Sequence, residues 1–212
     1  MSSQLYKKGT LNCIFESKNL FDYILFKKCF TSIGGTSLEE YANNTDSHKF
    51  ISIGNYSKEG TYIDNGQRIA FNEKTKDKLL NKNDLVMILN DKTISGDIIG
   101  STILINEDNK YIYNQRSERL ICNNIIDPIY AWTYLNYDKH RKRVFRQAQG
   151  GTQIYVNFPT IEKMKLQIPK SFDNQLLIGN INLSLTNKII IAEKQLEYIN
   201  QLKKGLMQNM FV

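Results

Sequence analysis

The chain has 212 residues, with 28 Lys or Arg against 21 Asp or Glu, so its formal net charge is +7. Hydrophobic residues make up 41% and aromatic residues 11%, which excludes a disordered chain. The length allows one domain of ordinary size, about 100 to 150 residues, plus an appendage, and excludes two full catalytic domains. Lys7 and Lys8 stand where a signal peptide would begin its apolar stretch, and no later run approaches ~18 apolar residues. We therefore expect a cytoplasmic protein that does not enter a membrane.

Short apolar runs separated by turn residues characterise the first 128 residues or so. Runs at 50–53, 85–89, 102–105 and 111–113 are rich in β-branched and aromatic residues, and clusters such as Asp64-Asn65-Gly66 separate them. Runs of this length bounded by such clusters are typical of strands, and the Asn-Gly step favours a tight hairpin turn. The pattern predicts a mixed α/β domain dominated by strands, without an evident internal repeat.

The excess positive charge is concentrated in one segment. Residues 131–170 contain eight Lys or Arg against two Asp or Glu, which accounts for +6 of the total, and the cluster is densest at 139–146. The run from 129 to 148 is expected to be one helix that ends at Gly150 and Gly151. Such a cluster is the usual electrostatic footprint of a protein that binds a polyanion, and a solvated helix face is the alternative.

The last forty residues have a different pattern, in which apolar or small residues recur in steps of three or four. The spacing predicts a helix over 173–210 that is roughly 55 Å long at ~1.5 Å per residue. A small domain does not need so long a stripe for its own core, so we expect a partner helix from another chain, with folding back onto the same domain as the alternative. The expected interface residues are Ile178, Ile181, Leu185, Ile189, Ala192, Leu196, Ile199, Leu202, Leu206 and Met210.

Catalytic and metal-binding motifs are not evident. The sequence has no Gly-rich phosphate loop followed by Lys-Ser or Lys-Thr, and its three cysteines and two histidines match no metal-ligand spacing. The segment 127–130, Asp-Pro-Ile-Tyr, differs from the motif of DNA amino-methyltransferases because Ile129 replaces the second proline, and no glycine-rich cofactor loop accompanies it. We therefore expect a non-catalytic protein without a metal site.

Several motifs together resemble one family. They are Gln-Gly-Gly-Thr-Gln-Ile-Tyr-Val-Asn at 149–157, Ile-Pro at 168–169, Phe-Asp-Asn-Gln at 172–175 and the Leu-Lys-Lys-Gly run that begins at 202, with upstream matches at 33–37, 50–54, 83–85 and 114–120. In these features the chain resembles the specificity subunit of type I restriction-modification enzymes. Members of that family carry two target recognition domains, each followed by a conserved helix. This chain has one of each and so is similar to a half-length subunit, a truncated one or an excised half.

The resemblance implies an organisation and a function. A target recognition domain is expected at 1–157, a connector at 158–172, and at 173–212 a helix that pairs as an antiparallel coiled coil in a homodimer and docks other subunits. The expected function is to read one half of a bipartite site in double-stranded DNA. Expected partners are modification (methyltransferase) subunits and a restriction (motor and nuclease) subunit, which would hold S-adenosylmethionine, ATP and Mg, while this chain holds no cofactor. The alternative is a coiled-coil adaptor whose basic segment binds an acidic protein, or nucleic acid without sequence specificity.

Candidate DNA-contacting residues follow from chemistry, because Arg, Lys, Asn and Gln side chains on exposed turns can reach base edges or phosphates. The candidates for base reading around the predicted hairpin and a second turn are Tyr56, Lys58, Tyr62, Asn65, Gln67, Arg68, Lys92 and Thr93. The candidates for phosphate contacts are Arg141, Lys142, Arg143 and Arg146. A plain surface role is the alternative for each residue.

Overall fold

The short apolar runs form strands that are arranged in four sheets within residues 2–17 and 19–210, which are the residues that the computed structural model describes. One four-stranded sheet has the order β2 (Phe30–Gly34), β10 (Ser117–Cys122), β6 (Leu85–Ile88) and β8 (Thr102–Leu104), with antiparallel neighbours throughout. The other has the order β3 (Ala42–Asn43), β5 (Arg68–Ile69), β4 (His48–Ile51) and β9 (Tyr111–Tyr113), and only β4 and β9 run parallel. The two-stranded sheets pair β1 (Phe21–Leu25) with β12 (Lys165–Pro169) and β7 (Asn90–Asp91) with β11 (Ile154–Tyr155).

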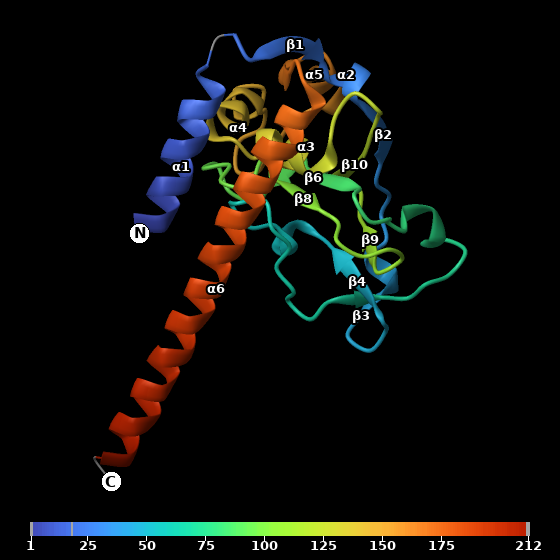
Figure 1. Ribbon diagram of the computed structural model, residues 1–212. Coiled ribbons are helices and arrows are strands. Elements are labelled where there is room, and N and C mark those ends of the chain that lie inside the picture. The colour runs from blue at the N-terminus through green and yellow to red at the C-terminus, as the bar shows by residue number, and fades with distance from the viewer. Residues whose placement is uncertain (1, 18, 211–212) are drawn as a thin grey trace.

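The helices lie on one side of the sheet β2-β10-β6-β8, and the longest of them extends away from the domain (Figure 1). They are α1 (Ser2–Phe15), α2 (Phe26–Cys29), α3 (Pro128–Leu135), α4 (Asp138–Phe145), α5 (Phe158–Glu162) and α6 (Phe172–Met210), with single 3-10 turns at Glu39–Tyr41, Ile53–Asn55 and Lys76–Lys78. The predicted fold class, a mixed α/β domain followed by a long C-terminal helix, is confirmed. The segment 158–172, expected to be a connector, contains α5 and β12, and β12 pairs with β1.

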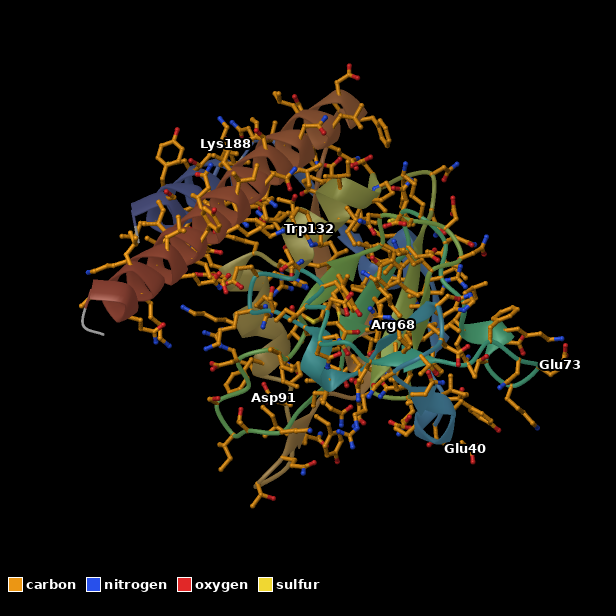
Figure 2. The ribbon with its side chains drawn as sticks, turned by 90° about the horizontal axis from the view of Figure 1, so that it is seen from below. Glu40, Arg68, Glu73, Asp91, Trp132 and Lys188 are labelled. Atoms are coloured by element: carbon orange, nitrogen blue, oxygen red, sulfur yellow. The ribbon has the colours of Figure 1, made fainter. Side chains whose placement is uncertain are left out.

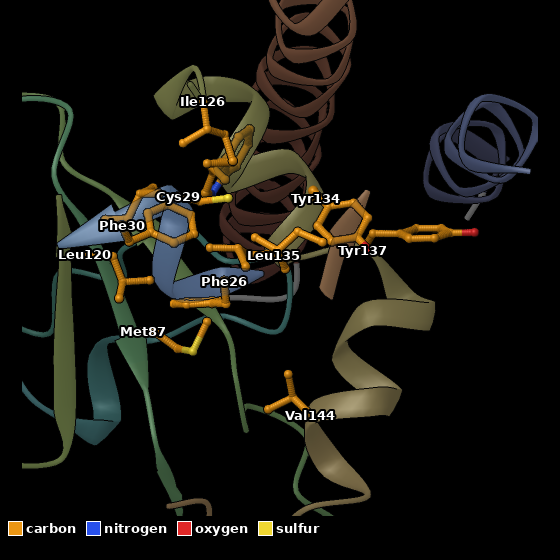
Figure 3. Close-up of a cluster of buried hydrophobic side chains, with 14 of the residues drawn as sticks. Phe26, Cys29, Phe30, Met87, Leu120, Ile126, Tyr134, Leu135, Tyr137 and Val144 are labelled. Atoms are coloured by element: carbon orange, nitrogen blue, oxygen red, sulfur yellow. The ribbon is translucent and has the colours of Figure 1, made fainter. Parts of the chain in front are cut away.

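Strand β6 separates two hydrophobic cores, which explains its uninterrupted apolar sequence. Leu85 and Met87 belong to the main core with the helices, whereas Val86 and Ile88 belong to a second core between the two four-stranded sheets. A strand that is buried on both faces needs apolar residues at every position. In the main core, Phe26 of α2 and Phe30 of β2 lie between Met87 and Leu120 of the sheet and Leu135 of α3 (Figure 3).

The single helix expected at 129–148 is two helices in the structure. The break lies at Asn136, whose Nδ2 donates hydrogen bonds to the carbonyl oxygens of Trp132 and Thr102 at 2.9 and 2.8 Å. Its Oδ1 accepts from the Thr102 N–H at 3.0 Å. An asparagine side chain that bonds to backbone groups competes with the helical hydrogen bonds, so it ends α3 and allows α4 to start in a new direction after Tyr137.

The Asp64-Asn65-Gly66 turn is present but does not close a hairpin. Gly66 has a positive φ of 84°, and its N–H donates to Asp64 Oδ1 at 3.1 Å. The strand that follows, β5, pairs with β3 and β4, which come earlier in the chain. The predicted hairpin is therefore wrong, although the turn itself is correct.

Helix α1 was not predicted, and it lies beside α6 with the opposite direction (Figure 1). Leu11 and Phe15 of α1 are 7% and 4% exposed and belong to the main core. Gln4 and Lys7 donate hydrogen bonds to side chains of α6. Because only a few apolar residues of α1 face the core, its sequence shows little helical periodicity, and tertiary packing decides its structure.

Helix α6 has 39 residues and is attached to the domain along its first part only. Ile178 is 4% exposed, and a Cβ atom on Gly179 would lie 2.9 Å from the backbone nitrogen of Tyr130, so α6 and α3 pack closely there. From Ile191 to Gln208 every residue is exposed. Among the described residues, no helix is long and apolar enough to cross a membrane.

Candidate nucleic-acid interface

Two of the four candidate phosphate-contacting residues project from the surface around α4. Lys142 and Arg146 are exposed and stand four residues apart, so they lie on the same side of the helix and its end. The other side of α4 is packed, because His140 and Val144 are buried against the domain. Both cations are therefore free to approach a polyanion.

Arg141 instead ties loops of the domain together. Its Nε, Nη1 and Nη2 donate hydrogen bonds to the carbonyl oxygens of Ile99, Lys58 and Asp97 at 2.8, 2.9 and 2.7 Å. Burial lowers the pKa of this guanidinium from its usual value. Since each of its nitrogen atoms is engaged inside the protein, Arg141 positions the surface around α4 and does not present its charge to a ligand.

Arg143 is half-buried on a different side of α4. Its Nη2 donates to the Lys165 carbonyl at 3.1 Å, and its Nη1 lies 3.5 Å from the Tyr134 hydroxyl. These contacts tie α4 to the strand β12. The structure thus assigns Arg143 to the packing of the domain and separates it from Lys142 and Arg146.

The candidates at 56–62 are mostly internal. Tyr56 is 4% exposed, and its hydroxyl donates to Ser117 Oγ at 2.8 Å, which contradicts a base-reading role. Tyr62 is half-buried, with its ring 5.2 Å from that of Tyr111. Lys58 is exposed, and its Nζ forms an ion pair with Asp97 at 2.6 Å, which brings this turn to the loop that contains Lys92 and Thr93.

A hydrogen-bonded network around the sheet β3-β5-β4-β9 contains Asn65, Gln67 and Arg68. Asn65 Oδ1 accepts from Asn55 Nδ2 at 2.9 Å, and Gln67 Oε1 accepts from Ser52 Oγ at 3.0 Å. The guanidinium of Arg68 donates to both carboxylate oxygens of Asp64, at 2.9 and 3.3 Å.

Asp64 is also paired with Lys49 at 2.9 Å. Hydrogen bonds from Arg68 and then Lys49 hold the pKa of the Asp64 carboxyl far below its usual range. The charge of Arg68 is therefore compensated inside the protein. In Figure 2, Arg68 lies well apart from Asp91, which marks the start of the loop with Lys92 and Thr93.

The loop at 91–97 lies next to α4, and sequence reasoning had named only two of its residues. Asp91 is 5% exposed and holds the loop, because its carboxylate accepts hydrogen bonds from the Thr93 N–H and Oγ1, both at 2.9 Å, and from the Ile98 N–H at 3.0 Å. Lys92 is exposed. The contacts of Arg141 and Lys58 with Asp97 join this loop, α4 and the turn at 57–60 into one surface.

The structure therefore brings together Lys58, Lys92, Thr93, Lys142 and Arg146, and it separates Asn65, Gln67 and Arg68 from them. An aspartate two residues before a threonine is a pattern typical of side-chain-capped turns, and Asp91-Lys92-Thr93 is the sequence signal that could have identified Asp91 as the support of this loop. Among the described residues, no group of three or more His, Cys, Asp or Glu side chains could hold a metal ion.

The ten predicted interface residues of α6 fall into two groups. Ile178 is a core residue of its own domain, which contradicts its assignment to an interface between chains, and Ile181, Leu185 and Ile189 are half-buried. Ala192, Leu196, Ile199, Leu202 and Leu206 are exposed, and the side chain of Met210 lies outside the described residues. The stripe is thus shared between the chain's own domain and a free surface.

Comparison with known proteins gives one family and several solved structures. Residues 14–201 match the family described as "Type I restriction modification DNA specificity domain". The type I restriction-modification S subunit from M. genitalium has a TM-score of 0.63 at 17% identity, and the match covers 87% of this chain and 44% of that one. A structure described as "Structural basis underlying complex assembly and conformational transition of the type I R-M system" has a TM-score of 0.68 at 12% identity, covering 96% and 49%.

The HsdS subunit from Thermoanaerobacter tengcongensis has a TM-score of 0.61 at 10% identity, covering 92% of this chain and 45% of that one. At these identities the three matches show a similarity of fold. The chain spans less than half the length of each of the three proteins. No curated protein sequence matches the chain. Because the family match extends over most of its residues, the chain belongs to the family of type I restriction-modification DNA specificity domains.

Proposed function

We propose that the chain is the sequence-specific DNA-recognition subunit of a type I restriction-modification system and reads one half of a bipartite target. The family match over residues 14–201 is the observation that carries this proposal. The domain at 1–157 would bind the duplex, and the rest of the chain would position it on a longer assembly. The protein would act in the cytosol without catalysis and without a cofactor of its own, while modification and restriction subunits supply S-adenosylmethionine, ATP and Mg.

The surface formed by the turn at 57–60, the loop at 91–97 and α4 would face the DNA. Lys92, Lys142 and Arg146 would contact phosphates, because they are exposed and none of them has an ion-pair partner among the described residues. Thr93 lies next to Lys92 and would approach the bases. DNA binding would involve Asn65, Gln67 and Arg68 only if the duplex extended to the sheet β3-β5-β4-β9, since their polar groups form hydrogen bonds within the protein.

The exposed half of α6 would pair with the same helix of a second copy in an antiparallel coiled coil. Leu196, Ile199, Leu202 and Leu206 are 59%, 58%, 49% and 64% exposed, and they recur at intervals of three or four residues. Apolar side chains in this pattern on a free helix favour association, since water otherwise surrounds them. The two recognition domains would then lie at opposite ends of a rod.

A repeated motif supports the antiparallel direction. Lys-Lys-Gly at 7–9, with Phe15 six residues later, recurs as Lys-Lys-Gly at 203–205, with Phe211 at the same interval. The first copy of the motif lies in α1, which runs antiparallel to α6, with Lys7 Nζ 2.8 Å from Thr186 Oγ1 and Gln4 Nε2 3.2 Å from Glu193 Oε1. A nine-residue repeat escaped the sequence analysis because only four of its positions are identical.

DNA recognition can be tested by selection from a random duplex library, first with the chain alone and then with the modification subunit of its host. The expected result is a bipartite and palindromic preference, because two identical domains would read two identical half-sites. Equal affinity for all duplexes would refute the proposal and would favour an adaptor. Sequencing of the methylated bases in cells that express both subunits would report the half-sites and their spacing independently.

The coiled coil can be tested by light scattering. Leu196→Asp places a charge in the apolar stripe and is expected to convert a dimer into a monomer. Gln201→Asp adds the same charge on the opposite side of the exposed helix and should leave the mass unchanged. Equal masses for the wild type and the Leu196→Asp variant would contradict the pairing.

A further inference from the structure

An isoleucine projects from the loop at 91–97, in the middle of the surface proposed to face the DNA. Ile94 is 66% exposed, the largest exposed fraction among the large hydrophobic side chains between β1 and β12. A single exposed apolar residue is ordinary on a protein surface. Ile94 differs from the ordinary case because hydrogen bonds hold its loop in place and because exposed cations lie near it in the chain.

The loop is fixed from inside and from both ends. Beyond the three hydrogen bonds that Asp91 accepts, Thr93 Oγ1 lies 2.9 Å from Ser95 Oγ, and the Gly96 N–H donates to the Thr93 carbonyl at 3.3 Å. At its far end Asp97 is held by the ion pair with Lys58 and by the hydrogen bond from Arg141. Ile94 is thus presented on a preorganised turn with most of its side chain exposed.

Gly96 allows α4 to approach the loop closely. It has a positive φ of 61°, and a Cβ atom there would lie 2.3 Å from the ring of Phe145 and 2.7 Å from Ile154 Cδ1. The Phe145 ring therefore lies directly on this glycine, two residues from Ile94, and it is itself 41% exposed. Ile94 and Phe145 are thus two exposed apolar side chains on elements that touch at Gly96, the loop at 91–97 and α4, and we call this pair the apolar ridge.

Cations flank this ridge. Lys92 is exposed two residues before Ile94, and Lys142 and Arg146 stand three residues before and one residue after Phe145. Phosphates of a duplex that contacted these cations on both sides would bring the ridge against the edges of the base pairs between them. A protein surface with an apolar tip between phosphate-binding cations has the chemistry of a wedge that enters between stacked bases.

We propose that Ile94 is such a wedge and unstacks one base step of the recognised half-site, with Phe145 supporting it. This inference rests on the proposed function. The burial of Ile94 between bases and the loss of base stacking oppose each other, so the wedge changes the affinity by less than about tenfold and acts mainly by distorting the DNA. It thereby favours half-sites with an easily unstacked pyrimidine–purine step, a preference that needs no hydrogen bond to a base.

The test uses the full chain, without other subunits, and the duplex that the selection experiment recovers. 2-Aminopurine replaces one base at a time along the half-site, and its fluorescence rises where stacking is lost. We expect the wild type to raise the fluorescence at one step. Ile94→Ser should abolish that rise while binding falls less than about tenfold, and Ile94→Met should keep it.

Ile63→Ser is the matched control, because Ile63 is 47% exposed on a different loop. It should leave the fluorescence profile unchanged. The wedge is overturned if the wild type raises the fluorescence nowhere, if Ile94→Ser keeps the wild-type profile, or if Ile63→Ser abolishes the rise as well. Failure of the selection to recover any preferred duplex would refute the proposed function before this step, so the two failures are distinct.

Discussion

Replacement of His140 by leucine should change how the stability of the protein depends on pH. His140 lies on α4 at 1% exposure, its ring centroid is 4.9 Å from that of Tyr134, and neither ring nitrogen has a hydrogen-bond partner among the described residues. Burial, and then the charges of Arg143 and Arg141, lower the pKa of His140 from 6.5 to about 3. The imidazole is therefore neutral in the folded protein at every pH where the unfolded chain begins to protonate it.

The magnitude follows from linkage. Because the unfolded state binds the proton below pH 6.5 and the folded state does not, acid lowers the free energy of unfolding progressively from about pH 6.5 to about pH 3. Between pH 7 and pH 5 this amounts to roughly 2 kcal/mol for one histidine. Glu118 acts in the opposite direction. Burial and then the charge of Glu162 raise the pKa of its carboxyl to about 7, so this group lowers the free energy of unfolding as the pH rises toward and through 7. The wild-type pH profile alone cannot separate these two groups.

The comparison of variants does separate them. Urea unfolding of the wild type and His140→Leu is measured at pH 7 and at pH 5. Between these two pH values the free energy of unfolding of the wild type should fall by roughly 2 kcal/mol more than that of His140→Leu. If His140→Leu and the wild type lost the same free energy of unfolding between pH 7 and pH 5, the burial of a neutral imidazole would be refuted as a source of acid sensitivity.

Two further predictions concern a turn and the charged surface. Gly60→Ala should lower the free energy of unfolding by more than about 2 kcal/mol, because Gly60 has a φ of 78° and a Cβ there would lie 2.2 Å from Asn136 Oδ1. Gly66 has a φ of 84° and open space around it, so Gly66→Ala should cost only about 1 kcal/mol of backbone strain. Equal costs of the two substitutions in urea unfolding would contradict the role of Asn136. Replacement of both Lys142 and Arg146 by Gln should reduce the slope of log K against log salt for duplex binding by about 2, since each phosphate contact contributes about 0.9, and an unchanged slope would place the DNA elsewhere.

Continuous apolar runs and the apolar stripe near the C-terminus predicted their elements well. The apolar runs at 85–88 and 111–113 are strands, and the stripe from Ile178 onward is a helix that continues to Met210. In each case local sequence and tertiary packing favour the same structure. The break at Asn136 escaped prediction because it depends on hydrogen bonds with Thr102, a residue far away in the sequence.

The candidate site was predicted less completely, because charge and polarity do not reveal whether a side chain is already engaged. Arg141 and Lys142 are adjacent cations in the sequence, yet the first donates to three carbonyl groups of the domain and the second is exposed. Arg68 likewise looks like a base reader until Asp64 is seen to hold it from four residues away. The partners that a side chain finds in the folded chain decide these roles, and a single sequence carries no direct signal of them.

The joint between α6 and the domain determines how precisely a rod of paired helices could set the distance between two half-sites. A tilt of about 10° at the base of a helix roughly 58 Å long would move its far end by ~10 Å, which is about three base pairs at ~3.4 Å each. The joint resists such a tilt through buried polar groups. Gln175, at 3% exposure, accepts from the Asp127 N–H at 2.9 Å and donates to the Ile125 carbonyl at 3.1 Å. Two turns later Asn182 donates to Thr133 Oγ1 at 3.0 Å. Because apolar contacts alone would let the helix slide or rotate, these directional bonds on α3 and the loop before it are what would give such a rod a defined angle.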